Sequence, residues 1–267
     1  SNDYGQQVAI YSGSSGDSFH NIEDNIINHY HRGRDRADYC IKAYSNKIIR
    51  NNTINADEIQ SAIHANSNCV IENNTITGDY SSQIFDISGD STIVLNNITT
   101  NSGNAWGFYT SSGSGMEFYN NIFYHSGSGG LAWNSSSDVR IHHNLFEGNS
   151  GRGIEFINQS SGKIYNNTLV SNSGDYGIYE TNQTNVPVYN NIVQGFSSGI
   201  YAENTIANYN LANNLLWDIS GNLFEGSALP PLVGQMIDQN VNGNSSDIYN
   251  NIYFDPLFVH PDTNNYN

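Results

Sequence analysis

The sequence predicts an all-β solenoid of about nine coils, in which three short strands and three turns repeat about every 23 residues. An Asn doublet recurs along most of the chain, and its second Asn returns at intervals of 22 to 24 residues. Short runs of β-branched and aromatic residues, such as Cys69–Glu72, lie between turns rich in Ser, Gly and Asn. No segment of the sequence keeps the i, i+3, i+4, i+7 spacing of an amphipathic helix over a helix's length.

Asn suits this repeat for two physical reasons. It tolerates the left-handed backbone conformation of a tight corner. In stacked coils its side-chain amide can also bond to the copies above and below. Solvated Asn in loops is the alternative, but it would not hold a constant period. We therefore predict an internal Asn ladder through the second residue of each doublet: Asn52, Asn74, Asn97, Asn121, Asn144, Asn167, Asn191 and Asn214.

The repeat x-I-x-x-N-N-x-[IL] resembles the right-handed, single-stranded parallel β-helix of the pectate-lyase-like superfamily. The segment Asp255–Phe258 is similar to one often found near the end of such domains, and the resemblance covers roughly residues 7–258. It implies the fold, but the superfamily includes polysaccharide lyases, glycoside hydrolases, epimerases, phage tailspikes and non-catalytic surface proteins. The sequence has neither the R-x-P-x-x-R signature of pectate lyases nor the N-T-D and G-H pair of polygalacturonases.

A chain of 267 residues can build one continuous core coil by coil, and we predict a single β-helix domain over residues 1–267. Two intervals exceed the repeat: Asn52 follows Asn25 after 27 residues, and Asn251 follows Asn214 after 37. We therefore expect loop insertions near residues 29–37 and 218–248, the first leaving the coil at His29. Neither end has an evident cap, so we expect a fragment of a longer protein and self-association through open coil ends.

The formal net charge of −16 argues against nucleic acid and anionic membranes as partners, because phosphate binding depends on Lys and Arg. No run of 18 apolar residues occurs, so we predict no membrane span. Cys40 and Cys69 occupy different phases of their repeats and are not expected to pair. We expect an extracellular or cell-surface protein, in which eight N-x-S/T sequons would permit glycosylation.

Basic residues concentrate in one part of the chain. Six of the nine fall within 19 positions, just after His29 and His31: Arg32, Arg34, Arg36, Lys42, Lys47 and Arg50. On an acidic protein this basic island could capture a carboxylate or sulfate group. The alternative is that its members pair with surface acids, namely Asp24, Asp35, Asp38 and Glu58.

One outward row collects the candidate chemistry. The strand that opens each coil carries an inward apolar residue, and the residue after it must point outward. These outward residues form a stripe: Lys42, His64, Asp86, Tyr109, Ala132, Glu155, Tyr179 and Tyr201. With Trp133 one position away, the stripe offers acid and base groups beside aromatic rings, as an enzyme or binding protein for polysaccharides requires.

Two mechanisms compete for the stripe. In β-elimination from a uronate, Lys42 or His64 would be the base, with Asp86 beside it and Arg34 or Arg36 neutralising the developing charge. Hydrolysis needs two carboxyl groups about 5 to 9.5 Å apart, whereas Asp86 and Glu155 would be about 14 Å apart. Elimination is therefore favoured, with Tyr109, Trp133, Glu155, Tyr179 and Tyr201 binding the sugar chain.

Other interpretations stay open. The protein could bind carbohydrate without catalysis, or form an adhesive or fibrous scaffold. A second outward row, Tyr119, His142, Tyr165 and Tyr189, could simply stabilise neighbouring strands. Ca²⁺ is the only cofactor suggested, because it prefers oxygen ligands and Asp35 and Asp38, with Glu58 and Asp86, could supply them if the loop folds back.

Overall fold

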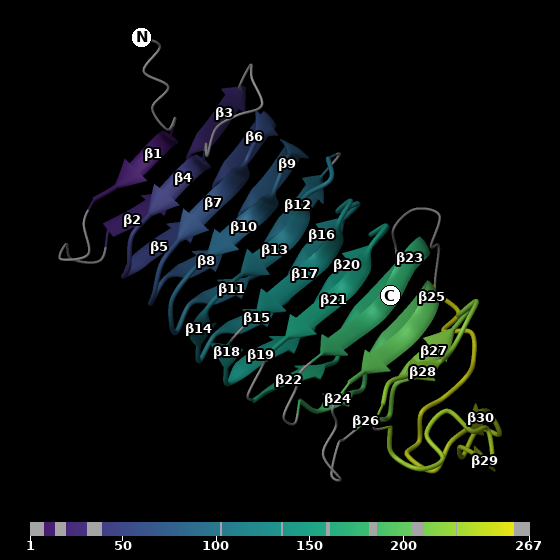
Figure 1. The fold of residues 1–267 in the computed structure, drawn as a ribbon. Helices are drawn as coiled ribbons and strands as arrows, with labels where there is room; N and C mark the ends of the chain where they lie inside the picture. The colour runs from purple at the N-terminus through teal and green to yellow at the C-terminus, as the bar shows by residue number, and fades with distance from the viewer. Residues whose placement is uncertain are drawn as a thin grey trace.

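The computed structural model describes residues 8–13, 20–30, 39–101, 103–134, 136–158, 161–181, 186–203, 211–227 and 229–258. All regular elements in these ranges are strands, as predicted. Successive coils stack side by side along one axis (Figure 1). Almost every strand pairs in parallel with its counterpart one coil away, so the sequence repeat becomes a repeat in space.

The coils present three parallel faces. The first face consists of β1 (Val8–Ser12), β4 (Tyr39–Ala43), β7 (Ser61–Ala65), β10 (Gln83–Ile87), β13 (Trp106–Thr110), β17 (Gly129–Asn134), β21 (Arg152–Ile157), the later parts of β23 (Thr168–Thr181) and β25 (Ile192–Ala202), and β28 (Phe224–Glu225). The second face is a 9-stranded sheet of β2 (His20–Glu23), β5 (Lys47–Arg50), β8 (Val70–Glu72), β11 (Ile93–Leu95), β15 (Glu117–Tyr119), β19 (Val139–His142), β22 (Gly162–Tyr165), β24 (Val188–Tyr189) and β26 (Leu211–Ala212).

The third face consists of β3 (Ile26–Tyr30), β6 (Thr53–Ile59), β9 (Thr75–Tyr80), β12 (Ile98–Asn101), β16 (Ile122–Tyr124), β20 (Leu145–Glu147), the earlier parts of β23 and β25, and β27 (Leu215–Trp217). Two short pairs complete the strands, β14 (Gly113–Ser114) with β18 (Ser136–Ser137) and β29 (Asp238–Gln239) with β30 (Ser245–Ser246).

The Asn doublets make the corner between the second and third faces. The first residue of each doublet has the left-handed conformation, with φ between 55° and 57° from Asn51 to Asn213. The second residue is buried and forms the predicted ladder: its side-chain amide N–H donates to the Oδ1 of the next ladder Asn at 2.9 to 3.1 Å. The same side chain donates to a backbone carbonyl of the preceding coil, as Asn121 does to Val94 at 2.9 Å. The predicted ladder is confirmed, and Asn25 and Asn251 extend it at its two ends.

The ladder ends at a carboxylate. Asp247 is fully buried and accepts hydrogen bonds from the backbone and side-chain N–H groups of Asn251, both at 3.0 Å. It also accepts from the Tyr249 and Gly234 backbones and from the Tyr253 hydroxyl. A carboxylate only accepts hydrogen bonds, so it terminates a row of donors that would otherwise lack partners. The Asn ladder therefore ends on a hydrogen-bond acceptor.

The two long intervals are more regular than predicted. Strand β3 continues through His29 and Tyr30, which pair with Ala56 and Asp57, so the coil does not end at His29. Residues 31–38 lie outside the described part of the chain. Within 218–248, β28 adds a further strand to the first face and β29 pairs with β30 as a hairpin.

The core is a continuous column of aliphatic and aromatic side chains. Cys40 and Cys69 are buried free thiols, and burial raises the pKa of Cys40 to about 12. Glu180 is a buried acid beside this column: it is fully buried, and neither of its carboxyl oxygens has a hydrogen-bond partner among the described residues. Burial raises its pKa well above the ordinary value, which favours the neutral acid.

Replacing Asn121 by Ala should lower the free energy of unfolding by about 1 to 3 kcal/mol, because the backbone N–H of Asn97 loses its acceptor, and the Asn97 side-chain amide and the Val94 carbonyl each lose one hydrogen bond. Asn120→Ala is the matched control, since this neighbour is exposed and contributes only its left-handed backbone, worth about 1 kcal/mol. Urea unfolding of both variants tests this, and equal losses would contradict a dominant role for the ladder.

Glu180 should make the fold less stable as the pH rises. Its folded-state pKa lies above the unfolded value, so the folded chain keeps a proton that the unfolded chain releases above about pH 4.3. We expect Glu180→Gln to match the parent protein at pH 4 and to exceed its free energy of unfolding by about 1 to 3 kcal/mol at pH 8. Denaturation curves of both proteins at pH 4 and pH 8 test this. If Glu180→Gln has no higher free energy of unfolding than the parent protein at pH 8, the carboxyl group of Glu180 has a hydrogen-bond partner.

Candidate functional site

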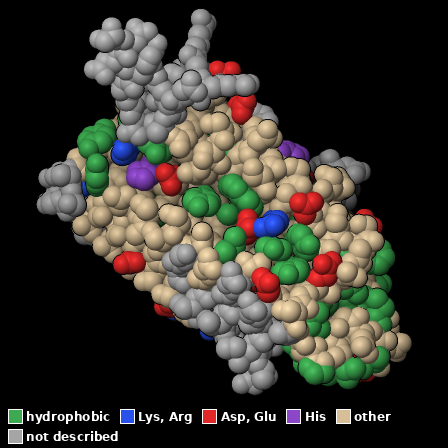
Figure 2. Space-filling view, in the orientation of Figure 1, with side chains coloured by type: hydrophobic (Ala, Val, Ile, Leu, Met, Phe, Trp, Pro, Cys, Tyr) green, Lys and Arg blue, Asp and Glu red, His purple; other side chains and the backbone are tan. Residues whose placement is uncertain are grey.

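The predicted stripe exists, and its strand phase is the one expected. Backbone pairing aligns Lys42 with His64, His64 with Asp86, and Asp86 with Tyr109. The row continues in register through Ala132, Glu155, Tyr179 and Tyr201, and Tyr11 and Glu225 extend it at its two ends. Figure 2 shows this face, with Lys or Arg, His and acidic side chains gathered near one end and hydrophobic side chains further along.

Three members of the stripe meet at its basic end. His64 Nδ1 lies 2.8 Å from Asp86 Oδ2, and the two side chains are 19% and 20% exposed, which leaves them accessible but partly desolvated. The ring of Tyr39 packs 5.0 Å from the His64 ring, and Lys42 Nζ lies 5.4 Å from the Tyr39 ring centre. This His–Asp site therefore combines a base, a carboxylate that orients it and a cation.

The Asp86 carboxylate determines which nitrogen of His64 is reactive. Because an ionised carboxylate only accepts hydrogen bonds, the neutral ring must carry its proton on Nδ1. Its Nε2 then keeps a lone pair, and among the described residues no group bonds to it. Burial, followed by the charge and hydrogen bond of Asp86, raises the pKa of Tyr39, so its hydroxyl stays protonated beside the pair.

Tyr109 follows the His–Asp site directly. It pairs with Asp86 on one side and with Ala132 on the other, and in the described part of the chain no aromatic ring stacks on it. Its ring is therefore free to stack on a sugar. Ala132 provides only a methyl group at the middle of the stripe, which separates the His–Asp site from the groups beyond.

A second cluster lies beyond Ala132. Arg152 forms an ion pair with Glu155, and its guanidinium lies 3.7 Å from the centre of the Tyr179 ring. The other face of Tyr179 stacks on Tyr201, with ring centres 4.7 Å apart and an angle of 18°. Burial raises the pKa of Glu155, although Arg152 opposes the shift. Both faces of Tyr179 are thus occupied by the protein itself.

One substrate-binding assignment must be corrected. Trp133 is 1% exposed and stacks on Phe108 inside the core, with ring centres 5.3 Å apart. It follows Ala132, and side chains alternate along a strand, so it points inward. Trp133 therefore cannot contact a polysaccharide on the surface.

The basic island is divided among different surroundings rather than forming one surface. Lys42 belongs to the stripe, Lys47 is fully buried, and Arg50 pairs with Glu23 on the second face at 2.6 Å. The predicted neutralising residues Arg34 and Arg36 and the predicted metal ligands Asp35 and Asp38 lie outside the described residues. Within the described ranges, no three His, Cys, Asp or Glu side chains form a group that could hold a metal ion.

Sequence reasoning missed a parallel row on the same face. Tyr39, Arg152 and Tyr176 each lie three residues before a member of the stripe, and each contacts a stripe side chain. Tyr39 pairs with Ser61 and Tyr176 pairs with Ser198, so the two serines occupy the same position in neighbouring coils. The constant three-residue offset was the signal that could have identified them.

The model of the family described as "Right handed beta helix region" matches residues 61–216. The chain therefore belongs to the right-handed β-helix family, in agreement with its parallel coils and Asn ladder. No curated protein and no solved structure matched the chain. In the described residues, no helix is long and apolar enough to cross a membrane.

Proposed function

We propose that this β-helix is an extracellular, polysaccharide lyase-like enzyme that cleaves a uronate-containing chain by β-elimination. The observation that supports this most is the 2.8 Å contact between His64 Nδ1 and Asp86 Oδ2, which leaves His64 Nε2 as an accessible base. Lys42 stands beside His64 in the same row. A cation at this position would stabilise the negative charge that develops on the uronate carboxylate.

The proposed step balances without a co-reactant. His64 Nε2 removes the proton from the carbon next to the carboxylate, and the electron pair of that C–H bond forms a carbon–carbon double bond. The bond from the neighbouring carbon to the leaving sugar oxygen breaks, and water protonates that oxygen. The hydroxide that remains takes the proton from His64 Nε2, so water and base are both regenerated. Lys42→Ala tests whether Lys42 acts as the base instead, and Arg34 and Arg36 remain proposed neutralising residues.

Elimination is favoured over hydrolysis by the position of the acids. Asp86 and Glu155 are separated by three strand pairings, through Tyr109 and Ala132. Three rises of about 4.8 Å place them about 14 Å apart, beyond the roughly 5 to 9.5 Å that paired glycosidase carboxyls require. Glu155 is also held by Arg152.

A non-catalytic scaffold or adhesive β-helix is the second candidate. It is favoured by the covered faces of Tyr179, whose contacts with Arg152 and Tyr201 tie three coils together. Such contacts stabilise neighbouring strands without any ligand. In that case the protein would not cleave any polysaccharide, with or without Ca²⁺.

The His–Asp assignment predicts separate kinetic effects. His64→Ala should lower kcat about 10²- to 10⁴-fold, the usual contribution of a general base. Asp86→Asn should also lower kcat, because an amide can hold the ring in the wrong tautomer. The assay follows the absorbance of the unsaturated product on alginate, polygalacturonate and glycosaminoglycans, with Ca²⁺ or with EDTA.

His125→Asn is the matched control, since this exposed histidine directly follows β16 and its left-handed backbone suits Asn. Full activity in both His64→Ala and Lys42→Ala would reject the site. Absence of turnover in the parent protein on every polymer would favour the scaffold.

The ring contacts predict which tyrosine binds sugar. Tyr109→Ala should weaken oligosaccharide binding about 5- to 150-fold, because one stacked ring contributes about 1 to 3 kcal/mol. Tyr179→Ala should change binding much less and instead lower stability, since its faces contact Arg152 and Tyr201. Calorimetric titration and thermal unfolding of both variants separate the two effects. The reverse order would mean that the ring stack opens for the ligand.

A further inference from the structure

The second face carries its own polar cluster, far along the sheet from the Arg50–Glu23 pair. The rings of Tyr119, His142, Tyr165 and Tyr189 stack in one row, with successive centres 5.1, 4.7 and 5.2 Å apart. A neighbouring outward row aligns Glu117 with Arg140, and Arg140 with Lys163. Arg140 and Lys163 are both exposed.

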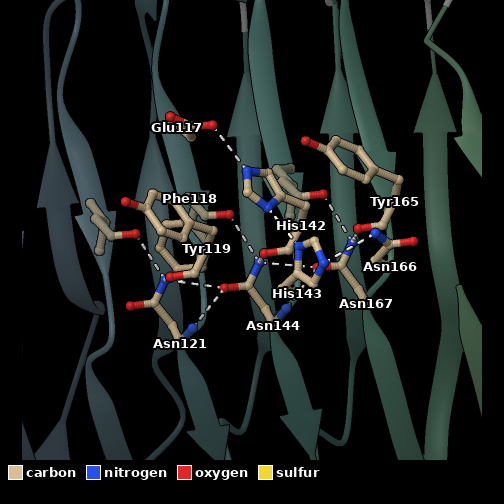
Figure 3. A network of polar contacts seen from close by, with 12 residues as sticks. Glu117, Phe118, Tyr119, Asn121, His142, His143, Asn144, Tyr165, Asn166 and Asn167 are labelled. Atoms are coloured by element: carbon tan, nitrogen blue, oxygen red, sulfur yellow. Dashed lines mark hydrogen bonds and ion pairs between the residues drawn. The ribbon is translucent and has the colours of Figure 1, made fainter.

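A chain of hydrogen bonds crosses this cluster (Figure 3). Asn166 Nδ2 donates to His143 Nε2 at 3.1 Å, His143 Nδ1 donates to His142 Nδ1 at 2.8 Å, and His142 Nε2 donates to Glu117 Oε1 at 3.0 Å. Each bond fixes the tautomer required by the next. All four ring nitrogens therefore have partners, and the chain ends on Glu117.

This chain leaves two cations without acidic partners. Glu117 is the acid opposite Arg140 in the strand register, but His142 holds its carboxylate. In the described part of the chain, neither Arg140 nor Lys163 forms an ion pair, and Asp138, two residues before Arg140, does not pair with it. By contrast, Arg50 and Arg152 each have a carboxylate.

We propose that Arg140 and Lys163 form a second binding site, distinct from the stripe, for the carboxylate or sulfate groups of an acidic polysaccharide. Neighbouring unpaired cations on a protein of net charge −16 complement anionic groups repeated along a polymer. The site holds the chain without cleaving it. Glu117 Oε1 is engaged by His142, and Glu117 forms no ion pair with Arg140 among the described residues.

The ring row defines how the polymer contacts this face. The tyrosine and histidine rings stack on one another at the spacing of the coils, so the facing sides of successive rings are covered and their edges remain for a ligand. Contacts would therefore come from Tyr165 and Tyr189 hydroxyl groups and from the two cations. The choice of polymer rests on the proposed function, but the site itself is tested by binding rather than turnover.

The test is calorimetric titration with heparin oligosaccharides and polygalacturonate oligomers at 0.15 M NaCl, in a His64→Ala background that prevents the proposed cleavage. Arg140→Gln and Lys163→Gln should each weaken binding about two- to fivefold, as loss of one exposed cation allows. Arg50→Gln is the matched control on the same sheet, because it removes one charge that Glu23 already neutralises.

Glu117→Gln gives a test in the opposite direction. Its amide oxygen can still accept the His142 bond while the negative charge is removed, so binding should tighten about two- to fivefold. Equal affinity in Arg140→Gln, Lys163→Gln and Arg50→Gln would overturn the site. Two results would overturn the assignment to an acidic polysaccharide. One is that neutral dextran binds as tightly as the acidic oligosaccharides. The other is that inorganic sulfate binds as tightly as they do and is weakened equally by Arg140→Gln and Lys163→Gln. If the parent protein cleaves no polysaccharide, the proposed function fails, but these binding results still test the second site.

Discussion

The buried Asn ladder is the interaction on which the remaining structure depends. Each ladder Asn accepts two hydrogen bonds from the Asn before it and donates to the Asn after it. A slip of one residue in any coil would break these bonds and turn every side chain of that coil to the opposite face. The ladder therefore sets the register, and the register arranges outward residues in straight rows about 4.8 Å apart.

Straight rows constrain what the surface can do. Aromatic residues in successive coils stack face to face, as Tyr179 and Tyr201 do, and their faces then serve the protein rather than a ligand. A ring is left open only where its neighbours in the row are not aromatic, and Tyr109 between Asp86 and Ala132 is that case on the stripe. The interruption of the row is thus what can create a sugar-binding ring.

The sequence predicted the fold, the ladder and the phase of the stripe because all three are properties of the repeat. Two kinds of feature were not predicted: those formed by residues outside the repeat, and the inward direction of individual side chains that follows from strict alternation along a strand. Asp247 ends the ladder from a position four residues before Asn251, where no doublet points to it. Trp133 and Lys47 were placed outside although alternation from Leu131 and Ile49 directs both inward. Tyr39 lies at the constant offset of three residues before the stripe, so its place beside the stripe is also a property of the repeat.

On this scaffold, the best guides to function are residues that deviate from the repeat and do not stabilise the stacking of the coils. A buried Glu180 without hydrogen-bond partners among the described residues and a histidine at the left-handed position of a doublet are both less favourable than the residues the repeat would supply. His143 replaces an Asn, yet the ladder continues through Asn144, and the added ring connects Asn166 to His142 and so to Glu117. Because the ladder does not need this ring, its effect lies on the surface, where it holds the His142 ring that binds the Glu117 carboxylate.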